Sequence, residues 1–180
     1  MHLCAALLKG VNVGGRGKIA MTDLKAWAEG LGFRSVRTLL QSGNMVFDPG
    51  DRAGAELEAF LETQATERLA LSTAFLVRTQ QQLNEAIAAN PFEQAARRDP
   101  SHLLVVFLKA EPEPSALEAL RSAASNGENL SAAGRHLYAT FPQGIAGSRL
   151  ASVIAGPKMR TPATARNWNT VQKLHSLLGG

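Results

Sequence analysis

Cysteine is nearly absent from this sequence. Cys4 is the single cysteine among 180 residues, so no intrachain disulfide can form. A chain without disulfides suits the reducing cytoplasm, and we expect a cytoplasmic protein. Cys4 stands inside the apolar run "LCAALL", which favours a small buried hydrophobic side chain over a reactive nucleophile.

Long hydrophobic runs are missing as well. No stretch approaches the roughly 18 consecutive apolar residues of a membrane-spanning helix. The first apolar run has no basic residue before it and is interrupted at Lys9, so it predicts a β-strand and not a signal peptide. Hydrophobic residues still make up 45% of the chain, without a polar low-complexity tract, which is typical of a folded globular protein with no membrane partner.

The motifs of common catalytic and metal sites are also absent. The four histidines are dispersed, no His-x-x-x-His or Cys-x-x-Cys spacing occurs, and we expect no metal site. No serine stands in a Gly-x-Ser-x-Gly motif, and no pair of acids falls in the segments rich in Gly, Asn and Arg. The sequence therefore identifies no reaction, no cofactor and no oligomeric state, and it leaves open whether the protein is an enzyme.

Acidic residues are absent from both ends of the chain. No Asp or Glu follows Glu128, although six Lys or Arg residues do, and Lys9, Arg16 and Lys18 precede the first acid, Asp23. Two basic segments without internal compensation would attract an anion if the fold brings them together. That anion could be a phosphate, a carboxylate or a nucleic-acid backbone. Alternatively, the basic residues only solvate a surface.

The order of apolar runs and turn signals predicts an α+β fold of two ferredoxin-like (βαββαβ) halves, packed together as a pseudo-duplication. Residues 1–99 would form the first half with an extra helix, and residues 100–180 the second half with a C-terminal helix. In the first half we expect strands at 3–9 and 72–78, a hairpin at 35–48, and helices capped by Thr22 and following residue 51. In the second half we expect strands at 102–109, 128–131, 135–141 and 161–167, and helices at 115–124 and 148–155.

The two additional helices carry capping signals. Thr79 and Gln82 form a T-x-x-Q capping box, and Asn169 with Gln172 would cap the last helix in the same way. Pro162 confines the strand at 161–167 to the edge of its sheet or to its own first residues, because proline cannot donate to a ladder.

The central strands "LCAALL" and "LLVVFL" are apolar at successive positions, so both faces of each strand should be covered. An RNA-recognition sheet instead exposes stacking aromatic side chains on its central strands. The first half offers only Phe47 there, and the second offers Phe107, Tyr138 and Phe141 without the expected motif. An open sheet of that type is therefore not expected.

The segment "KGVNVGGRGK" combines four glycines with three basic residues and is similar to a phosphate cradle. A P-loop would need Gly at position 12 and Ser or Thr at position 19, where Asn12 and Ile19 stand. A dinucleotide-binding motif would need an acid about twenty residues further on, which is missing. A loop remains whose backbone N–H groups can approach an anion, or simply a flexible loop with glycine for its turns. The candidate ligand-binding residues in this loop are Lys9, Asn12, Gly14, Gly15, Arg16 and Lys18.

Two further segments carry more polar groups than their local structure needs. "QSGN" is a turn signal that needs no ligand, yet it adds polar side chains at the end of a sheet. In "TARNWNTV", an arginine fork beside the free N–H groups of a helix entrance suits a phosphate or a carboxylate. Alternatively, Arg166 bonds backbone carbonyls and Trp168 fills the space between the halves. The candidate residues here are Ser42, Asn44, Arg166, Asn167, Trp168 and Asn169.

Five segments, "ALLKGVNVGG", "MTDLKAWAEGLGF", "VRTLLQSGNMVF", "GSRL" and "TARNWNTVQKL", together resemble the bacterial family known as domain of unknown function 1697. The similarity is most specific in "GVNVGG", "QSGN" and "TARNWNTV". It implies an α+β fold with ferredoxin-like subunits, and it carries over no catalytic residue because the family has no established activity. The resemblance marks as site candidates Asn12, Gly14, Gly15, Lys18, Ser42, Asn44, Arg166, Asn167 and Asn169.

We therefore expect a cytoplasmic protein that binds a small phosphate- or carboxylate-bearing ligand between the "GVNVGGRGK" loop and the "RNWN" helix entrance. One alternative is nucleic-acid binding over a wider basic surface, with an affinity that falls steeply as salt rises. Another alternative is that the motif residues are purely structural and tie the two halves together.

Overall fold

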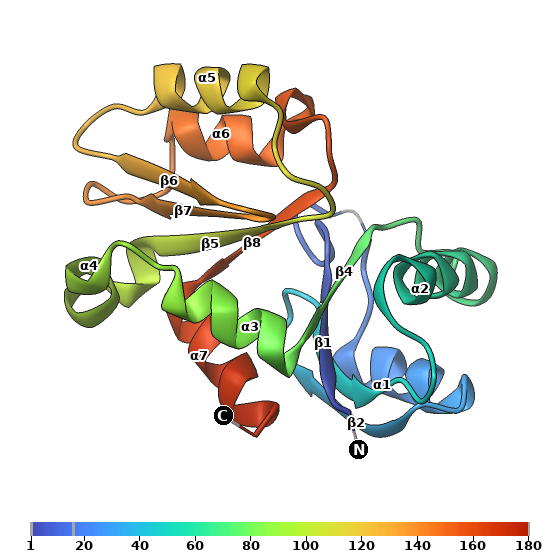
Figure 1. The fold of residues 1–180 in the computed structure, drawn as a ribbon. Coiled ribbons are helices and arrows are strands. Elements are labelled where there is room, and N and C mark those ends of the chain that lie inside the picture. Colours follow the sequence, from blue (N-terminus) through green and yellow to red (C-terminus); the bar gives the residue numbers. More distant parts are fainter. Residues whose placement is uncertain (1, 16, 180) are drawn as a thin grey trace. The chain divides into compact units, whose positions relative to one another are not determined.

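The computed structural model describes residues 2–15 and 17–179 (Figure 1). The chain forms two compact units. The first unit comprises Met1–Asn84 together with Leu174–Gly180, and the second unit comprises Glu85–Lys173. The expected division into residues 1–99 and 100–180 stays a prediction, and the strands of the second sheet begin at Leu103.

The first unit is built on a four-stranded antiparallel sheet. Its elements are β1 (Cys4–Leu8), α1 (Met21–Gly30), β2 (Arg34–Leu39), β3 (Asn44–Asp48), α2 (Gly54–Leu69) and β4 (Phe75–Thr79). The strand order β2-β3-β1-β4 places β1 and β3 in the centre. This is the βαββαβ arrangement of a ferredoxin-like fold, so the prediction is confirmed.

The core of the first unit lies between this sheet and its two helices. Successive side chains of a strand point to opposite faces, and Ala6 of β1 packs in one cluster with Leu24 of α1 and Leu61 of α2. Ala5 and Leu7, which point to the opposite face, are also fully buried. Both faces of β1 are therefore covered, as its unbroken apolar sequence predicts.

The second unit repeats the plan of the first. Its elements are α4 (Glu93–Arg98), a 3-10 turn (Pro100–His102), β5 (Leu103–Leu108), α5 (Pro114–Ala123), β6 (Asn129–Ala133), β7 (His136–Thr140), α6 (Arg149–Ala155), a second 3-10 turn (Pro157–Met159) and β8 (Ala163–Asn167). The strand order β6-β7-β5-β8 matches the first sheet strand for strand. Helices α5 and α6 cover one face of this sheet (Figure 1), and Leu120 and Leu150 join Val106 of β5 in the core.

Two helices contribute residues to both units. Helix α3 (Gln80–Ala88) follows β4, and helix α7 (Trp168–Leu177) follows β8. The predicted capping box opens α3: the Gln82 N–H donates to Thr79 Oγ1 at 3.2 Å, and the Thr79 N–H donates to Gln82 Oε1 at 3.0 Å. Two free N–H groups are thereby satisfied reciprocally, and this prediction is confirmed.

Two predicted caps are each wrong by two residues. Helix α1 begins before Thr22, and its cap position is held by Ala20, which is extended and makes no side-chain bond. Helix α7 begins at residue 168, so Asn169 lies inside its first turn. The cap is instead Asn167, whose Oδ1 accepts a hydrogen bond from the Thr170 N–H at 3.0 Å. Here the end of strand β8 decides which asparagine can cap the helix.

Strand β8 lies at the edge of its sheet and begins directly after Pro162, as the proline predicts. Helix α4 was not predicted, because it is short, polar and without a buried residue. In the part of the chain that the structure describes, no helix has both the length and the apolar character needed to cross a membrane.

The aromatic side chains of the sheets are buried. Phe47, Phe107, Tyr138 and Phe141 have no exposed surface, so none of these four can stack on a nucleic-acid base. The Tyr138 hydroxyl donates to the carbonyl of Ala86 at 2.5 Å, and burial raises the pKa of this tyrosine to about 12. These rings are part of the core.

The turn between β2 and β3 packs against the start of the Gly-rich loop. The Leu8 N–H donates to the Gly43 carbonyl at 2.9 Å, and Gly43 has a φ of 77°. A Cβ at this position would lie 2.3 Å from Cγ2 of Val11 and 3.0 Å from Cβ of Leu8. The close approach of turn and loop therefore requires glycine for its size as well as its conformation.

Replacing Gly43 tests this close approach. Gly43→Ala should lower the free energy of unfolding by about 3 kcal/mol, because a positive φ and a steric clash act together. The matched control is Gly50→Ala, since Gly50 has a similar φ of +65° but no atom within 4 Å of the added Cβ. That variant should lose only about 1 kcal/mol. Urea unfolding measures both values, and equal losses would contradict the packing argument.

The thiol of Cys4 should be inert in the folded protein. Cys4 is 3% exposed, and burial, with a smaller contribution from the Asp48 carboxylate, raises its pKa to about 12. The nucleophilic thiolate is therefore scarce at neutral pH, and a thiol reagent should react only after guanidinium unfolds the chain. Titration with a chromogenic disulfide checks this, and rapid labelling of the native protein would show that Cys4 becomes accessible.

Candidate functional site

The Gly-rich loop between β1 and α1 is closed by one side chain. Asn12 donates through Nδ2 to the carbonyls of Ile19 at 2.9 Å and Gln41 at 2.7 Å. Its Oδ1 accepts from the Ile19 N–H at 2.9 Å, and its own N–H donates to the Gly17 carbonyl at 3.1 Å. Asn12 thus joins both ends of the loop to the turn of the hairpin. These hydrogen bonds of Asn12 give the loop a defined conformation.

The loop backbone has the left-handed conformation at several positions. Asn12, Gly14, Gly15 and Gly17 have φ values of 55°, 61°, 78° and 57°. Asparagine tolerates this region better than other residues with a side chain, and glycine enters it without strain. Turns that contain left-handed residues are common in known anion-binding concavities.

The turn residues Ser42 and Asn44 have structural partners. Asn44 is fully buried, and its Nδ2 donates to the Leu39 carbonyl at 2.8 Å and to Ser42 Oγ at 3.0 Å. These bonds stabilise the turn of the hairpin, whose Gln41 carbonyl accepts the hydrogen bond from Asn12. Both residues therefore support the loop from the turn side.

A hollow of about 590 Å³ opens beside the loop. Among the predicted loop residues, the structure brings Asn12, Gly15 and Lys18 to its wall, and Lys9 and Gly14 do not line it. Arg16 lies outside the described residues. The remaining lining residues are Ile19, Ala20, Asp23, Gln41 and Leu69. The wall thus carries one basic and one acidic side chain among its described residues, next to glycine backbone.

The predicted residues of "TARNWNTV" belong to the second unit and have separate roles. Arg166 is 7% exposed in β8, and its Nη1 donates to Thr164 Oγ1 at 2.7 Å and to the Ala165 carbonyl at 2.8 Å. Burial lowers its pKa to about 10, so the guanidinium keeps its charge at neutral pH. The bond to the Ala165 carbonyl is of the kind that the structural alternative for Arg166 expects.

The other members of this segment lie around the entrance of α7. Asn167 caps the helix, and Asn169 is exposed. Trp168 is half-buried and lines a hollow of about 440 Å³ together with Gln172 and Arg97. The structure therefore distributes the polar groups of this segment among a strand, a cap and a surface hollow of the second unit.

Sequence reasoning missed a second buried arginine. Arg78 in β4 has no exposed surface, and its Nη1 donates to the Val77 carbonyl at 2.8 Å. It stands opposite Ala5 of the central strand, as Arg166 stands opposite Val105. The signal is present in "LVRTQQQL" and "TARNWNTV": in each, an arginine immediately precedes the residue that caps the next helix. The duplication is thus visible in residues as well as in element order.

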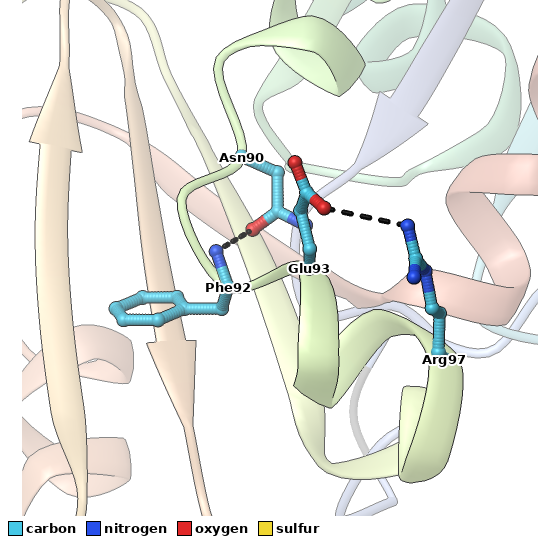
Figure 2. Close-up of polar contacts among 4 residues, drawn as sticks. All are labelled: Asn90, Phe92, Glu93 and Arg97. Atoms are coloured by element: carbon cyan, nitrogen blue, oxygen red, sulfur yellow. Dashed lines mark hydrogen bonds and ion pairs between the residues drawn. The ribbon is translucent and has the colours of Figure 1, made fainter.

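Sequence reasoning also missed a hollow of about 680 Å³ in the second unit. Segment 90–102 forms one wall, and residues from the start of β6 and the end of β7 form the other. Figure 2 shows its rim at α4, where the Phe92 N–H donates to Asn90 Oδ1 at 3.0 Å and Arg97 pairs with Glu93 at 3.4 Å. Within the hollow, His102 Nδ1 lies 2.9 Å from Asp99 Oδ2. No single segment carries a motif that would have indicated this site.

The described residues contain no group of three or more His, Cys, Asp or Glu side chains arranged to hold a metal ion.

The whole fold occurs in a solved bacterial structure. The chain is similar to a conserved bacterial protein, SP0830 from Streptococcus pneumoniae, with 22% sequence identity, a TM-score of 0.76 and coverage of 98% of each chain. At this level of identity the likeness shows the fold alone. No curated protein matches the sequence.

A family model described as a protein of unknown function (DUF1697) matches residues 1–138. The matched part includes the Gly-rich loop and the "QSGN" turn and ends before β8. It covers most of the chain and agrees with the resemblance seen in the loop and turn motifs. The chain therefore belongs to the family of proteins of unknown function DUF1697.

Proposed function

We propose that the first unit binds a small anion, carrying a phosphate or a carboxylate, in the hollow beside the Gly-rich loop. The observation that carries this proposal is the loop itself, which Asn12 holds closed while Gly15 and Lys18 line the hollow. A glycine backbone lets an anion approach its N–H groups closely. Lys18 supplies the positive charge.

The charge around the hollow limits the ligand. Lys18 is exposed and has no acidic partner among the described residues within salt-bridge distance, whereas Asp23 lines the same hollow. A large polyanion would bring some of its charges next to Asp23. A single phosphate or carboxylate group can contact the loop side alone, so the proposal is for a small ligand with one compact anionic group.

Arg166 has no assigned role in this proposal. Its guanidinium bonds to Thr164 and Ala165 of its own strand, and it belongs to the second unit. Lys18 is therefore the cation whose removal tests the site. The protein would be a binding protein, or an enzyme whose reaction acts on the bound anion.

Removing the charge of Lys18 should abolish the effect of the anion. We expect one or more of inorganic phosphate, phosphorylated metabolites and small organic acids to raise the melting temperature of the wild-type protein, because a ligand of the native state stabilises it. Lys18→Gln should weaken the affinity about tenfold, as loss of one charge-assisted hydrogen bond predicts. The matched control is Lys25→Gln, since Lys25 is an exposed lysine of the same unit that pairs with Glu29 at 3.7 Å and lies outside the hollow.

The same panel separates the alternatives. Short oligonucleotides that bind with a steep salt dependence, and lose a similar amount of affinity in both lysine variants, would favour a wider basic surface. If no ligand raises the melting temperature and Asn12→Ala lowers it strongly, the result would favour a purely structural loop. Equal anion binding by the wild type and Lys18→Gln would contradict the proposed site.

A further inference from the structure

The hollow of about 680 Å³ in the second unit has a chemistry different from that of the loop site. Its polar lining residues include His102, Asp99, Glu93, Asn129 and Thr140. Its apolar lining residues include the half-buried Phe92 and the prolines Pro91 and Pro142. A cavity of this size, with apolar surface and a few convergent polar groups, is typical of sites for small organic molecules.

The hydrogen bond between His102 and Asp99 determines which ring nitrogen of the neutral His102 can act as an acceptor. An ionised carboxylate can only accept, so at 2.9 Å the proton of this bond belongs to His102 Nδ1. In the neutral ring Nε2 then carries the lone pair. No described residue forms a hydrogen bond with Nε2, although His102 lines the hollow. Asp99 thus positions His102 to accept a hydrogen bond from a ligand.

Asn129 presents a second acceptor. Its Nδ2 donates to the Gly127 carbonyl at 3.0 Å and to Thr140 Oγ1 at 3.3 Å, which occupies both amide hydrogens. The amide is therefore oriented, and its Oδ1 accepts from no described residue. A ligand that donates hydrogen bonds would find both Asn129 Oδ1 and His102 Nε2 available among the lining residues of the hollow.

The charged groups of the hollow are acidic. No Lys or Arg is among its described lining residues, whereas the carboxylates of Asp99 and Glu93 are. Arg97 pairs with Glu93 at 3.4 Å, but the two side chains are 80% and 77% exposed, so this ion pair is weak and another cation can replace Arg97 at little cost. The hollow should therefore favour a positive charge.

An aromatic ring stands beside these acceptors. Figure 2 shows the ring of Phe92 extending away from Asn90 and Glu93, and Phe92 lines the hollow. A ring face attracts a cation electrostatically, and a ring also offers apolar contact to the carbon part of a ligand. A carboxylate, two neutral acceptors and aromatic surface together are complementary to an organic ammonium group.

The geometry points to a second binding site of this protein, in the hollow between α4 and the strands β6 and β7, for a small primary amine with an apolar ring. The ammonium group donates to His102 Nε2, to Asn129 Oδ1 and to the Glu93 carboxylate, while the ring of the ligand packs on Phe92. Asp99 is a positioning residue, because it acts through His102. This site lies within the second unit and does not depend on the anion site of the first.

A matched set of three probes tests the charge of the ligand. Phenethylammonium, 2-phenylethanol and phenylacetate share a ring and differ in whether their polar end is positive, neutral or negative. We expect phenethylammonium to bind with a Kd of about 1 mM and the other two at least about tenfold more weakly, measured by amide and imidazole chemical shifts of the ¹⁵N-labelled protein. The shifts of Phe92 and His102 should move, and Lys18→Gln should leave this binding unchanged.

Three variants separate the site from general attraction to an acidic surface. Glu93→Gln and Asp99→Asn should each weaken phenethylammonium binding about tenfold, and Glu118→Gln, an exposed carboxylate on α5 outside the hollow, should not. Glu93 is exposed on α4, so its variant keeps the test valid if Asp99→Asn unfolds the turn. Phenylacetate binding as tightly as the amine, equal losses in all three variants, or no probe binding below about 10 mM would each overturn the proposal.

Discussion

The side chain of Asn12 is the interaction on which the first unit's loop depends. It donates to two carbonyls that lie far apart in the sequence, those of Ile19 and Gln41, and it accepts from the Ile19 N–H. An amide can donate and accept at once in a plane, and asparagine also tolerates the positive φ found there. The glycines of the loop would otherwise leave it many conformations, because glycine loses more freedom on ordering than any other residue.

Much of the fold could be predicted from the sequence, because the signals for the sheets are local. The unbroken apolar runs of β1 and β5 and the polar turns between strands identify the elements, and their order gives the ferredoxin-like plan twice. Cap positions were less certain, since Asn167 and Asn169 have the same chemistry and only the pairing of β8 decides between them. Helix α4 could not be predicted from the sequence, because it buries no side chain and so shows no apolar period.

Of the two candidate sites, only the one made by a single segment could be predicted from the sequence. Asn12, Gly15 and Lys18 come from one short segment, and its composition indicated them before any fold was known. The hollow of the second unit takes its walls from four short stretches of chain, each of which has an ordinary local role as a cap, a turn or a strand end. Only the pairing of β6 with β7 and the turn after α4 bring these stretches together. Composition is therefore a guide to sites made by one segment and a poor guide to sites made by several.

The division of helix α7 has a consequence for how the chain can fold during synthesis. The first unit includes Leu174–Gly180, although all its strands are complete by residue 79. A ribosome makes the whole second unit before it supplies that last piece, so the first sheet can form early but its unit is completed late. Closing contacts over this separation in sequence slows folding, since long-range pairing must overcome a large loss of chain entropy. The second unit, in contrast, is one continuous segment and can fold as soon as it has emerged.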